Sequence, residues 1–558
     1  MPPQSASILT SCCIEVRMSL NTRVLIVKNI KLSLNASNQE AFSVAEKRIK
    51  KIGINTSGFK YSIYKKSVDA RRKDEIHFVY SVCAIGAFPD ISEKLLVESS
   101  MSFEDKRELL DFERGDEKMS APPLVVGSGP AGLFAALMLA ENGYAPILIE
   151  RGGSVKERKR AISSFAKSRV LDKNTNIQFG AGGAGTFSDG KLVTRVNDPA
   201  SSYVLERFVS FGAPEEILYM ARPHIGTDIL SEVVEKIIAR IEELGGKVLY
   251  HTQLLSLTRT EPIGIAHTTN GDIPYSSIVL AIGHSARDTY NELINSGFII
   301  EPKPFSVGMR IEHFADSIDK SLYGDFAGHP ALGHAEYNLS HNTKERGVYT
   351  FCMCPGGEVV AATSEEHGTV VNGMSYHSRA GKNSNSAVVC SIFKEDYGNT
   401  AQKAIEFQRS IEHAAFRAGG SDYSAPIITV GDFLSGKCER DPYSVFPTYM
   451  GGGGVKLVRP DEFLPSFVCR SISNAIQDFD HKIRGFADNG AVLTGAETRT
   501  SAPVRIMRDT KTRLAIGSGN IYPSGEGAGY AGGITSAAID GIYTAIAIMK
   551  KYKPTNNG

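Results

Sequence analysis

Residues 124–132 read Leu-Val-Val-Gly-Ser-Gly-Pro-Ala-Gly, a short apolar segment that runs directly into a glycine-rich turn. The turn has the spacing Gly-x-Gly-x-x-Gly, and an apolar helical segment follows over 131–142. Strand, turn and helix in this order are typical of the dinucleotide-binding unit of a Rossmann-type fold. The first glycine permits the tight turn, the second lets the backbone approach a pyrophosphate, and the third allows close packing of helix on strand.

An acidic residue, Glu150, follows the next predicted strand, 146–149. A carboxylate at this place accepts hydrogen bonds from a ribose and disfavours a 2′-phosphate, so the pattern favours FAD or NAD over NADP. The alternative is a fortuitous glycine-rich turn. This alternative is the weaker one, because strand, glycines, helix and acid occur together. The candidate cofactor-binding residues of this unit are Gly127, Ser128, Gly129, Pro130, Ala131, Gly132, Glu150 and Arg151.

Three other segments favour FAD. Residues 150–152 (Glu-Arg-Gly) resemble the end of this strand in FAD enzymes, and residues 281–283 (Ala-Ile-Gly) resemble a short turn of many flavoproteins. Residues 522–527 resemble a motif whose acid, here Glu526, holds the ribityl chain. The helix expected from Ile534 would direct its positive end at the flavin ring, with a purely structural helix as the alternative. The candidates here are Ala281, Gly283, Gly525, Glu526, Gly532, Gly533 and Ile534.

The loop 179–191 reads Phe-Gly-Ala-Gly-Gly-Ala-Gly-Thr-Phe-Ser-Asp-Gly-Lys. Packing alone does not require so many glycines, so we expect its amides to line the pyrophosphate or the flavin edge. Ser188 or Lys191 would then hydrogen-bond the ring, whereas a plain flexible loop is the alternative. The candidates are Gly182, Gly183, Gly185, Thr186, Ser188, Gly190 and Lys191.

These motifs, with the segments 352–357 (Cys-Met-Cys-Pro-Gly-Gly) and 525–537, resemble the uncharacterised FAD-dependent dehydrogenases of bacteria and plastids, also called NAD(FAD)-utilising dehydrogenases. The resemblance covers about 120–545. It implies a glutathione-reductase-like FAD fold with bound FAD, and it implies no settled substrate. Ser524 departs from the family pattern, where many relatives are expected to carry Cys, so the resemblance gives no flavin-side thiol at that position.

The cysteines limit the chemistry. No Cys lies in 151–200, which excludes the disulfide reductases that place a redox pair soon after the first βαβ unit. Cys352 and Cys354 would share one face of a strand and form either a redox pair or buried structural thiols. Structural thiols are favoured, because spacing by one residue strains a disulfide.

The remaining site predictions concern substrate and reductant. A second Gly-x-Gly-x-x-Gly after a strand is absent, so NADH or NADPH is expected only as a transiently docked reductant, and an organic substrate is the alternative donor. Arg499 and Lys191 are the substrate-side candidates, Arg499 as a clamp for a carboxylate. A salt-bridged scaffold role for Arg499 is at least as well supported, and neither a catalytic acid or base nor a metal site is identified.

The chain of 558 residues is too long for one core. We expect an α/β fold: a Rossmann-type FAD-binding domain, an inserted mixed α+β substrate domain and a small N-terminal α+β domain of ferredoxin-like type. The expected boundaries are 1–20 for a leader or misassigned start (Met18 being the alternative first residue), 21–105 for the N-terminal domain, 106–122 for a linker, 123–285 for the first part of the FAD-binding domain, 286–495 for the inserted domain and 496–558 for the C-terminal part of the FAD-binding domain.

Charge and composition add little to this picture. A net charge of +1 argues neither for nor against a nucleic-acid or membrane partner. Residues 46–73 hold ten Lys or Arg against two acids, which indicates either a nucleic-acid-binding face or, more often, a solvated surface. The apolar segment 534–549 is short for a membrane span and contains Asp540, and the scattered cysteines suit a reducing compartment. We therefore expect a cytoplasmic protein without a membrane partner.

Taken together, the sequence predicts an FAD-dependent oxidoreductase that transfers hydride at the flavin to or from a small-molecule substrate. The first alternative is an RNA-associated flavoprotein whose N-terminal domain binds nucleic acid. The second is a non-catalytic protein that FAD stabilises. The substrate and the oligomeric state are not predicted.

Overall fold

The computed structural model describes residues 23–104, 112–193 and 198–554. They divide into two compact units: one holds the described part of 1–111 with 198–223 and 322–333, and the other holds 112–193, 224–321 and 334–554. The expected leader, 1–20, and most of the first half of the expected linker lie outside the described residues. Within the described ranges, no helix combines the length and apolar character that a bilayer span requires.

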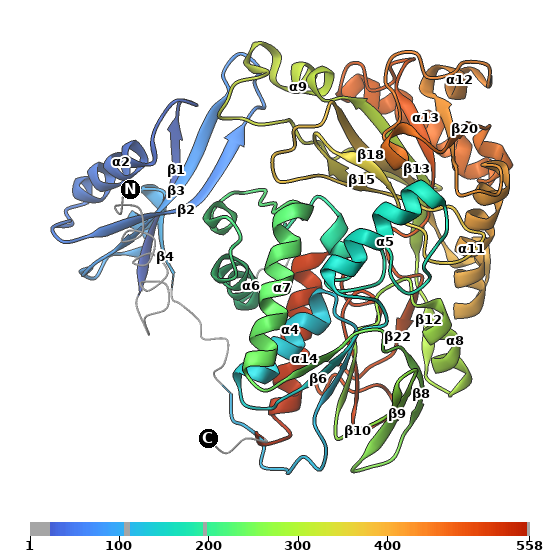
Figure 1. The fold of residues 1–558 in the computed structure, drawn as a ribbon. Helices are drawn as coiled ribbons and strands as arrows, with labels where there is room; N and C mark the ends of the chain where they lie inside the picture. The colour runs from blue at the N-terminus through green and yellow to red at the C-terminus, as the bar shows by residue number, and fades with distance from the viewer. Residues whose placement is uncertain (1–22, 105–111, 194–197, 555–558) are drawn as a thin grey trace, which may run out of the picture. The chain divides into compact units, whose positions relative to one another are not determined.

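The first unit contains a four-stranded antiparallel sheet with two helices (blue in Figure 1). Its elements are β1 (Val24–Leu32), α2 (Asn38–Lys51), β2 (Lys60–Asp69), β3 (His77–Ile85), α3 (Glu93–Glu98) and β4 (Met101–Glu104). The order β2-β3-β1-β4 and the β-α-β-β-α-β connectivity are those of a ferredoxin-like domain. The main chain of Lys66 bonds to Tyr219 and Ala221, which attaches the segment containing α6 (Pro199–Ser210) to this unit.

The basic stretch 46–73 lies on α2, on β2 and in the connections beside them. Ion pairs join Lys50 to Glu46 at 2.7 Å and Arg71 to Asp69 at 2.5 Å, so part of its charge is compensated locally. Several lysines of the stretch are exposed, namely Lys47, Lys51, Lys60, Lys65 and Lys73. Nucleic-acid binding by this face stays a prediction.

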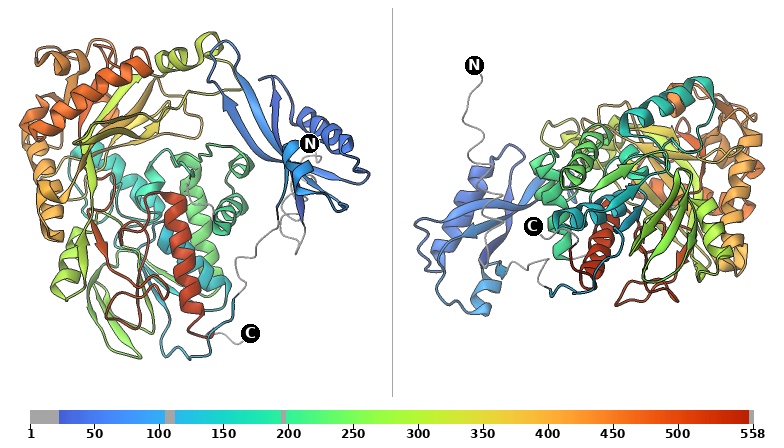
Figure 2. Two further views of the ribbon diagram at one scale, coloured as in Figure 1. Left: turned by 180° about the vertical axis from the view of Figure 1, so that it is seen from behind. Right: turned by 60° about the horizontal axis from the view of Figure 1, so that its bottom comes forward.

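The second unit is organised by a five-stranded parallel sheet of order β23-β11-β5-β6-β7. Its strands are β5 (Leu124–Val126), β6 (Ile147–Ile149), β7 (Lys247–Leu249), β11 (Ile278–Leu280) and β23 (Ile521–Pro523). The helices α4 (Pro130–Glu141), α7 (Thr227–Glu243) and α14 (Ile534–Met549) lie side by side (Figures 1 and 2). A Cβ on Gly541 of α14 would lie 2.0 Å from the carbonyl oxygen of Ala131 in α4, so these two helices meet at backbone distance.

A seven-stranded, mostly antiparallel sheet of order β14-β15-β18-β13-β21-β19-β20 forms the rest of this unit's framework. Its strands are β13 (Phe305–Phe314), β14 (Ser340–Asn342), β15 (Gly347–Cys354), β18 (Asn383–Ile392), β19 (Ala425–Thr429), β20 (Val455–Leu457) and β21 (Val492–Glu497). The boundary expected between 495 and 496 therefore falls inside β21. The boundary expected at 285 also differs from the packing, because Tyr290 and Leu293 belong to the same apolar core as the parallel sheet.

The remaining strands of the second unit form three smaller sheets, of order β10-β9-β8, β12-β22 and β16-β17, and further helices accompany them. These elements are α5 (Val155–Ser168), β8 (Leu254–Thr258), β9 (Gly264–Thr268), β10 (Gly271–Tyr275), α8 (Arg287–Asn295), β12 (Ile300–Pro302), β16 (Glu358–Ala361), β17 (Val371–Met374), α10 (Lys394–Tyr397), α11 (Ala401–Ala418), α12 (Val430–Ser435), α13 (Ser466–Lys482) and β22 (Val504–Ile506). The chain passes from the second unit to the first between residues 321 and 322, within the helix α9 (Ala315–Tyr323).

The contact between α4 and α14 generates a stability prediction. Gly541→Ala places a methyl group against the α4 backbone, which cannot move without disturbing the glycine-rich turn before it. We expect a loss of about 1–3 kcal/mol and a lower Tm in a thermal melt. Ala547→Ser, at a half-buried position of the same helix, is the control and should melt near the wild type. A Gly541→Ala variant as stable as this control would contradict the backbone contact.

Candidate cofactor site

A cavity of about 470 Å³ lies where the strands of the parallel sheet end. Its wall includes Gly127 after β5, Glu150 after β6, Ala281 after β11 and Ser524 after β23. Volumes of this size are typical of small-molecule sites, and the carboxyl edge of a parallel sheet is where α/β folds bind their ligands. The cavity is therefore the candidate cofactor site.

Most of the residues predicted from the sequence come together in this wall. Those that line the cavity are Gly127, Gly129, Pro130, Ala131, Glu150, Arg151, Gly183, Gly185, Ser188, Lys191, Ala281, Gly283, Arg499, Glu526, Gly532, Gly533 and Ile534. Six predicted residues lie behind the wall instead, namely Ser128, Gly132, Gly182, Thr186, Gly190 and Gly525. Gly132 shows why: a Cβ there would lie 1.8 Å from the carbonyl oxygen of Gly127, so this glycine serves packing.

Two helices begin at the cavity with bare glycine backbone. The N-caps of α4 and α14 are Gly129 and Gly533, and neither helix has a side-chain cap. The N–H groups of both first turns, with their partial positive charge, are available to an anionic ligand such as a pyrophosphate. Among the described atoms, a Cβ on Gly533 or Gly532 would meet nothing within 4 Å, and one on Gly129 only the Cα of Gly183, at 3.8 Å. The cavity thus fits a flat, anionic cofactor that approaches the main chain closely.

The buried carboxylate of Glu150 connects three loops of the wall. Its Oε1 accepts N–H bonds from Gly152 and Gly180 at 2.9 and 3.0 Å. Its Oε2 accepts the N–H and the hydroxyl of Ser128 at 2.9 and 2.6 Å. About four donors suffice for a carboxylate, so Glu150 acts here as a brace between loops. This arrangement differs from the ribose acceptor expected from the sequence, and it explains why Ser128 faces away from the cavity.

Glu526 presents a second carboxyl group to the cavity from the loop after β23. Burial raises its pKa to about 7, and Lys303 offsets that effect only in part. The loop is fixed by Asp540 of α14, whose Oδ2 accepts the N–H of Gly525 at 2.7 Å and whose Oδ1 pairs with Arg508 at 2.7 Å. In the sequence, Asp540 is a lone charge in an apolar helix. That isolated charge is the sequence signal of this anchor, although the sequence prediction used it only to exclude a membrane span.

Lys191 brings a cation to the wall from the glycine-rich loop. Its Nζ lies 3.2 Å from Asp189 and 3.2 Å from Glu336, and Arg379 pairs with both of these acids. Burial lowers the pKa of Lys191, but the two carboxylates outweigh burial and hold the pKa above its ordinary value. Ser188, the other residue expected at the ring, donates its hydroxyl to the carbonyl of Gly185 at 2.7 Å. Glu336 carries no sequence signal, because it lies in no motif.

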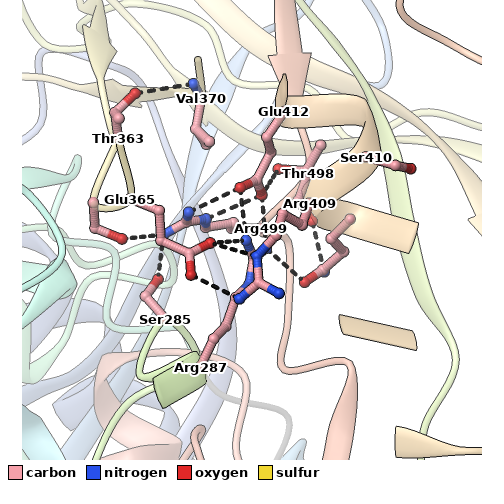
Figure 3. A network of polar contacts seen from close by, with 12 residues as sticks. Ser285, Arg287, Thr363, Glu365, Val370, Arg409, Ser410, Glu412, Thr498 and Arg499 are labelled. Atoms are coloured by element: carbon pink, nitrogen blue, oxygen red, sulfur yellow. Dashed lines mark hydrogen bonds and ion pairs between the residues drawn. The ribbon is translucent and has the colours of Figure 1, made fainter. Parts of the chain in front are cut away.

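Arg499, the expected carboxylate clamp, is held by the protein itself (Figure 3). Its Nη2 lies 3.0 Å from Glu412, and its Nη1 donates to Ser285 and Ser364. Arg287 binds the same Glu412 carboxylate at 2.7 Å, and both of these side chains are 1% exposed. A free clamp does not fit this arrangement, because the donors of Arg499 are already paired; the scaffold alternative fits it.

This network generates the second prediction. Glu412→Gln removes a carboxylate charge that both Arg287 and Arg499 bind, which leaves Arg287 with Glu365 at 2.6 Å and the buried guanidinium of Arg499 undercompensated. We expect a loss of about 3–5 kcal/mol, measured as a lower Tm. The control is Glu406→Gln, an exposed partner of Arg409 at 3.2 Å, which should change Tm little. Equal melting of the two variants would refute a structural role for the network.

Comparisons with known proteins bear on the cofactor and on the family of the chain. Residues 304–500 match a family described as FAD-dependent protein, C-terminal domain-like, and residues 26–84 match a domain of unknown function. An uncharacterized protein of Clostridium beijerinckii is 43% identical over 532 residues, which cover 94% of this chain and 98% of that protein. The predicted cofactor, FAD, is confirmed by the family match, whereas the dehydrogenase assignment is a finer statement that the match does not carry.

Solved structures resemble the chain only distantly. CtdE in complex with FAD is 11% identical, with a TM-score of 0.31 over 78% of this chain and 87% of that one. Glycine oxidase from Geobacillus kaustophilus is 10% identical, with a TM-score of 0.32 over 78% of this chain and 95% of that one. Neither likeness carries an argument about function. The near full-length match shows that the chain belongs to the family of the uncharacterized clostridial protein, and its residues 304–500 match the FAD-dependent protein, C-terminal domain-like family.

Proposed function

We propose that this protein is an FAD-dependent oxidoreductase that transfers hydride between the flavin and a small polar organic substrate. Bound FAD supplies the two-electron chemistry, and the chain binds and orients the cofactor. The observation that carries the proposal is the composition of one cavity, whose wall combines bare glycine backbone with polar side chains. Backbone suits the cofactor, and side chains suit a substrate that must be recognised.

The wall of the cavity combines backbone and side chains from several parts of the chain. Backbone at Gly129, Gly183 and Gly533 comes from the segments on and around the parallel sheet. Side chains come from this region and also from the residues that match the FAD-dependent family, which contribute Asn338, Phe351, Cys352, Asn372, Glu497, Arg499 and Thr500. Since the charges of Glu497 and Arg499 are engaged in buried ion pairs, the amides, the hydroxyl and the aromatic ring support a polar, weakly charged substrate.

Lys191 supports a role beside the reacting part of the cofactor. It is held charged by two carboxylates, and it lies on the loop that the sequence predicts at the pyrophosphate or the flavin edge. A fixed cation there would stabilise negative charge that develops on a reduced flavin. A nicotinamide donor would dock transiently, because the described residues contain one parallel sheet and one glycine-rich turn of this type.

Gly533→Ala tests whether the open space at the start of α14 belongs to FAD. Its φ of 174° is extended and suits alanine, and no described atom lies within 4 Å of the added Cβ. The fold should stay intact while FAD binding weakens about tenfold or more, which corresponds to about 1.4 kcal/mol. FAD content and affinity are measured by absorbance and by titration of the apoprotein. Gly453→Ala, with its nearest contact at 3.8 Å outside the cavity, should bind FAD normally. Normal FAD affinity in both variants would place the cofactor elsewhere.

Anaerobic flavin reduction tests the reaction itself. Purified holoprotein is mixed with NADH, NADPH and a panel of small polar metabolites, and bleaching of the oxidised flavin is followed by absorbance. We expect at least one compound to bleach the flavin, and reoxidation to follow when an acceptor is added. A flavin that dithionite reduces but no metabolite or nicotinamide reduces would favour the non-catalytic alternative.

A further inference from the structure

The end of strand β15 carries a bulge at Cys352. Its pairing with β18 joins Phe351 to Ala387 and Cys354 to Asn385, so three steps along β15 match two along β18. Cys352 has a φ of 46°, in the left-handed region that residues with side chains seldom adopt. The regular strand expected from the sequence, with both cysteines on one face, is therefore interrupted at this residue. Bulges of this kind often re-aim a side chain next to an active site.

A buried arginine holds the bulge in place. The Nη1 of Arg310 donates to the carbonyl oxygen of Cys352 at 3.0 Å and to Asn385 at 2.8 Å. Its Nη2 lies 2.8 Å from Glu497, and the Arg310 side chain is fully buried. The left-handed conformation of Cys352 is thus fixed by an ion pair that spans β13 and β21. The sequence periodicity does not indicate this contact, because Arg310 and Cys352 are distant in the chain.

The bulge places the thiol of Cys352 at the cavity. Cys352 lines the cavity, Cys354 is buried, and the Cys354 thiol donates to the main-chain carbonyl oxygen of Cys352 at 3.3 Å. The Cys354 side chain, together with Arg310 and Lys191, lowers the pKa of Cys352 to about 7, whereas Cys352 and burial raise the pKa of Cys354. One accessible thiol of low pKa and one buried thiol of high pKa are the asymmetry found in reactive cysteine pairs.

The position of Cys352 relates it to the cofactor. The electrostatic neighbours of its thiol include Lys191 on the glycine-rich loop, and the thiol in turn acts on Glu526. Both neighbours lie on segments assigned to FAD binding. Spacing by one residue strains a disulfide in a regular strand, but β15 is not regular here: Cys352 has a left-handed backbone and the Cys354 thiol lies 3.3 Å from the carbonyl oxygen of Cys352.

We propose that Cys352 and Cys354 form a redox-active dithiol that exchanges two electrons with the FAD bound in this cavity. The inference rests on the proposed function and names the protein's own electron carrier at that site. In the oxidative direction both S–H bonds break and one S–S bond forms, and the electron pair passes to oxidised FAD. One of the two protons follows the electron pair to the flavin, and the other leaves to solvent. Reduced FAD opens the disulfide by the reverse of this step.

An anaerobic dithionite titration of the holoprotein tests the exchange. The protein is first oxidised with diamide, which is then removed. Wild type should take up about twice as many electrons per FAD as Cys352→Ser, because the disulfide and the flavin are both two-electron couples. Cys469→Ser, which changes a cysteine outside the cavity wall, should match the wild type. A wild type that takes up only the electrons of its flavin overturns the proposal.

Mass spectrometry of the wild type keeps the test independent of whether a variant folds. After oxidation, the peptide that holds both cysteines should be lighter by two hydrogen atoms and should resist alkylation until the protein is reduced. Full alkylation of both cysteines in the oxidised protein overturns the proposal. If an organic donor reduces the flavin and the two thiols do not change, only this proposal is overturned. If the dithiol exchanges electrons with the flavin but no organic donor reduces the protein, only the proposed function is contradicted.

Discussion

The four hydrogen bonds to the carboxylate of Glu150 are the interaction on which the cofactor site depends. A buried carboxylate is costly unless charge-assisted hydrogen bonds compensate it, and here the donors come from the turn after β5, the end of β6 and the loop 179–191. One acid therefore sets the positions of three backbone segments relative to one another. These three segments, joined through Glu150, form part of the cavity wall.

The same principle recurs on the other side of the cavity. Asp540 fixes the loop that carries Glu526, and Glu412 fixes Arg287 and Arg499. Each of these acids lies behind the wall or deep within a network. The wall itself combines glycine backbone and two helix N-termini with side chains that include Lys191, Cys352 and Glu526. The structural charges on Asp540 and Glu412 therefore lie on other residues than Lys191 and Cys352, which line the cavity.

Sequence patterns predicted the parts of the site that are encoded locally. The glycines at 127, 129 and 183 and the start of α14 follow from motifs whose spacing is itself the geometric requirement. Roles that depend on distant partners did not follow: Glu336 and Glu412 lie in no motif, and Arg499 had the right position but an unforeseen partner. The bulge at Cys352 was missed for the same reason, since Arg310, which holds it, lies 42 residues away in the sequence. The ferredoxin-like type of the first unit could be predicted because its apolar patterning is local and α2 has its own cap.

The central claim is that one FAD occupies this glycine-lined cavity with its pyrophosphate at the first turns of α4 and α14. The most direct measurement is to denature the purified holoprotein and to identify and count the released flavin by chromatography and absorbance, together with reconstitution of the apoprotein by FAD and by FMN. The account predicts one FAD per chain and far tighter binding of FAD than of FMN, which lacks the pyrophosphate. A chain that holds no flavin after reconstitution, or that binds FMN as tightly as FAD, would contradict it.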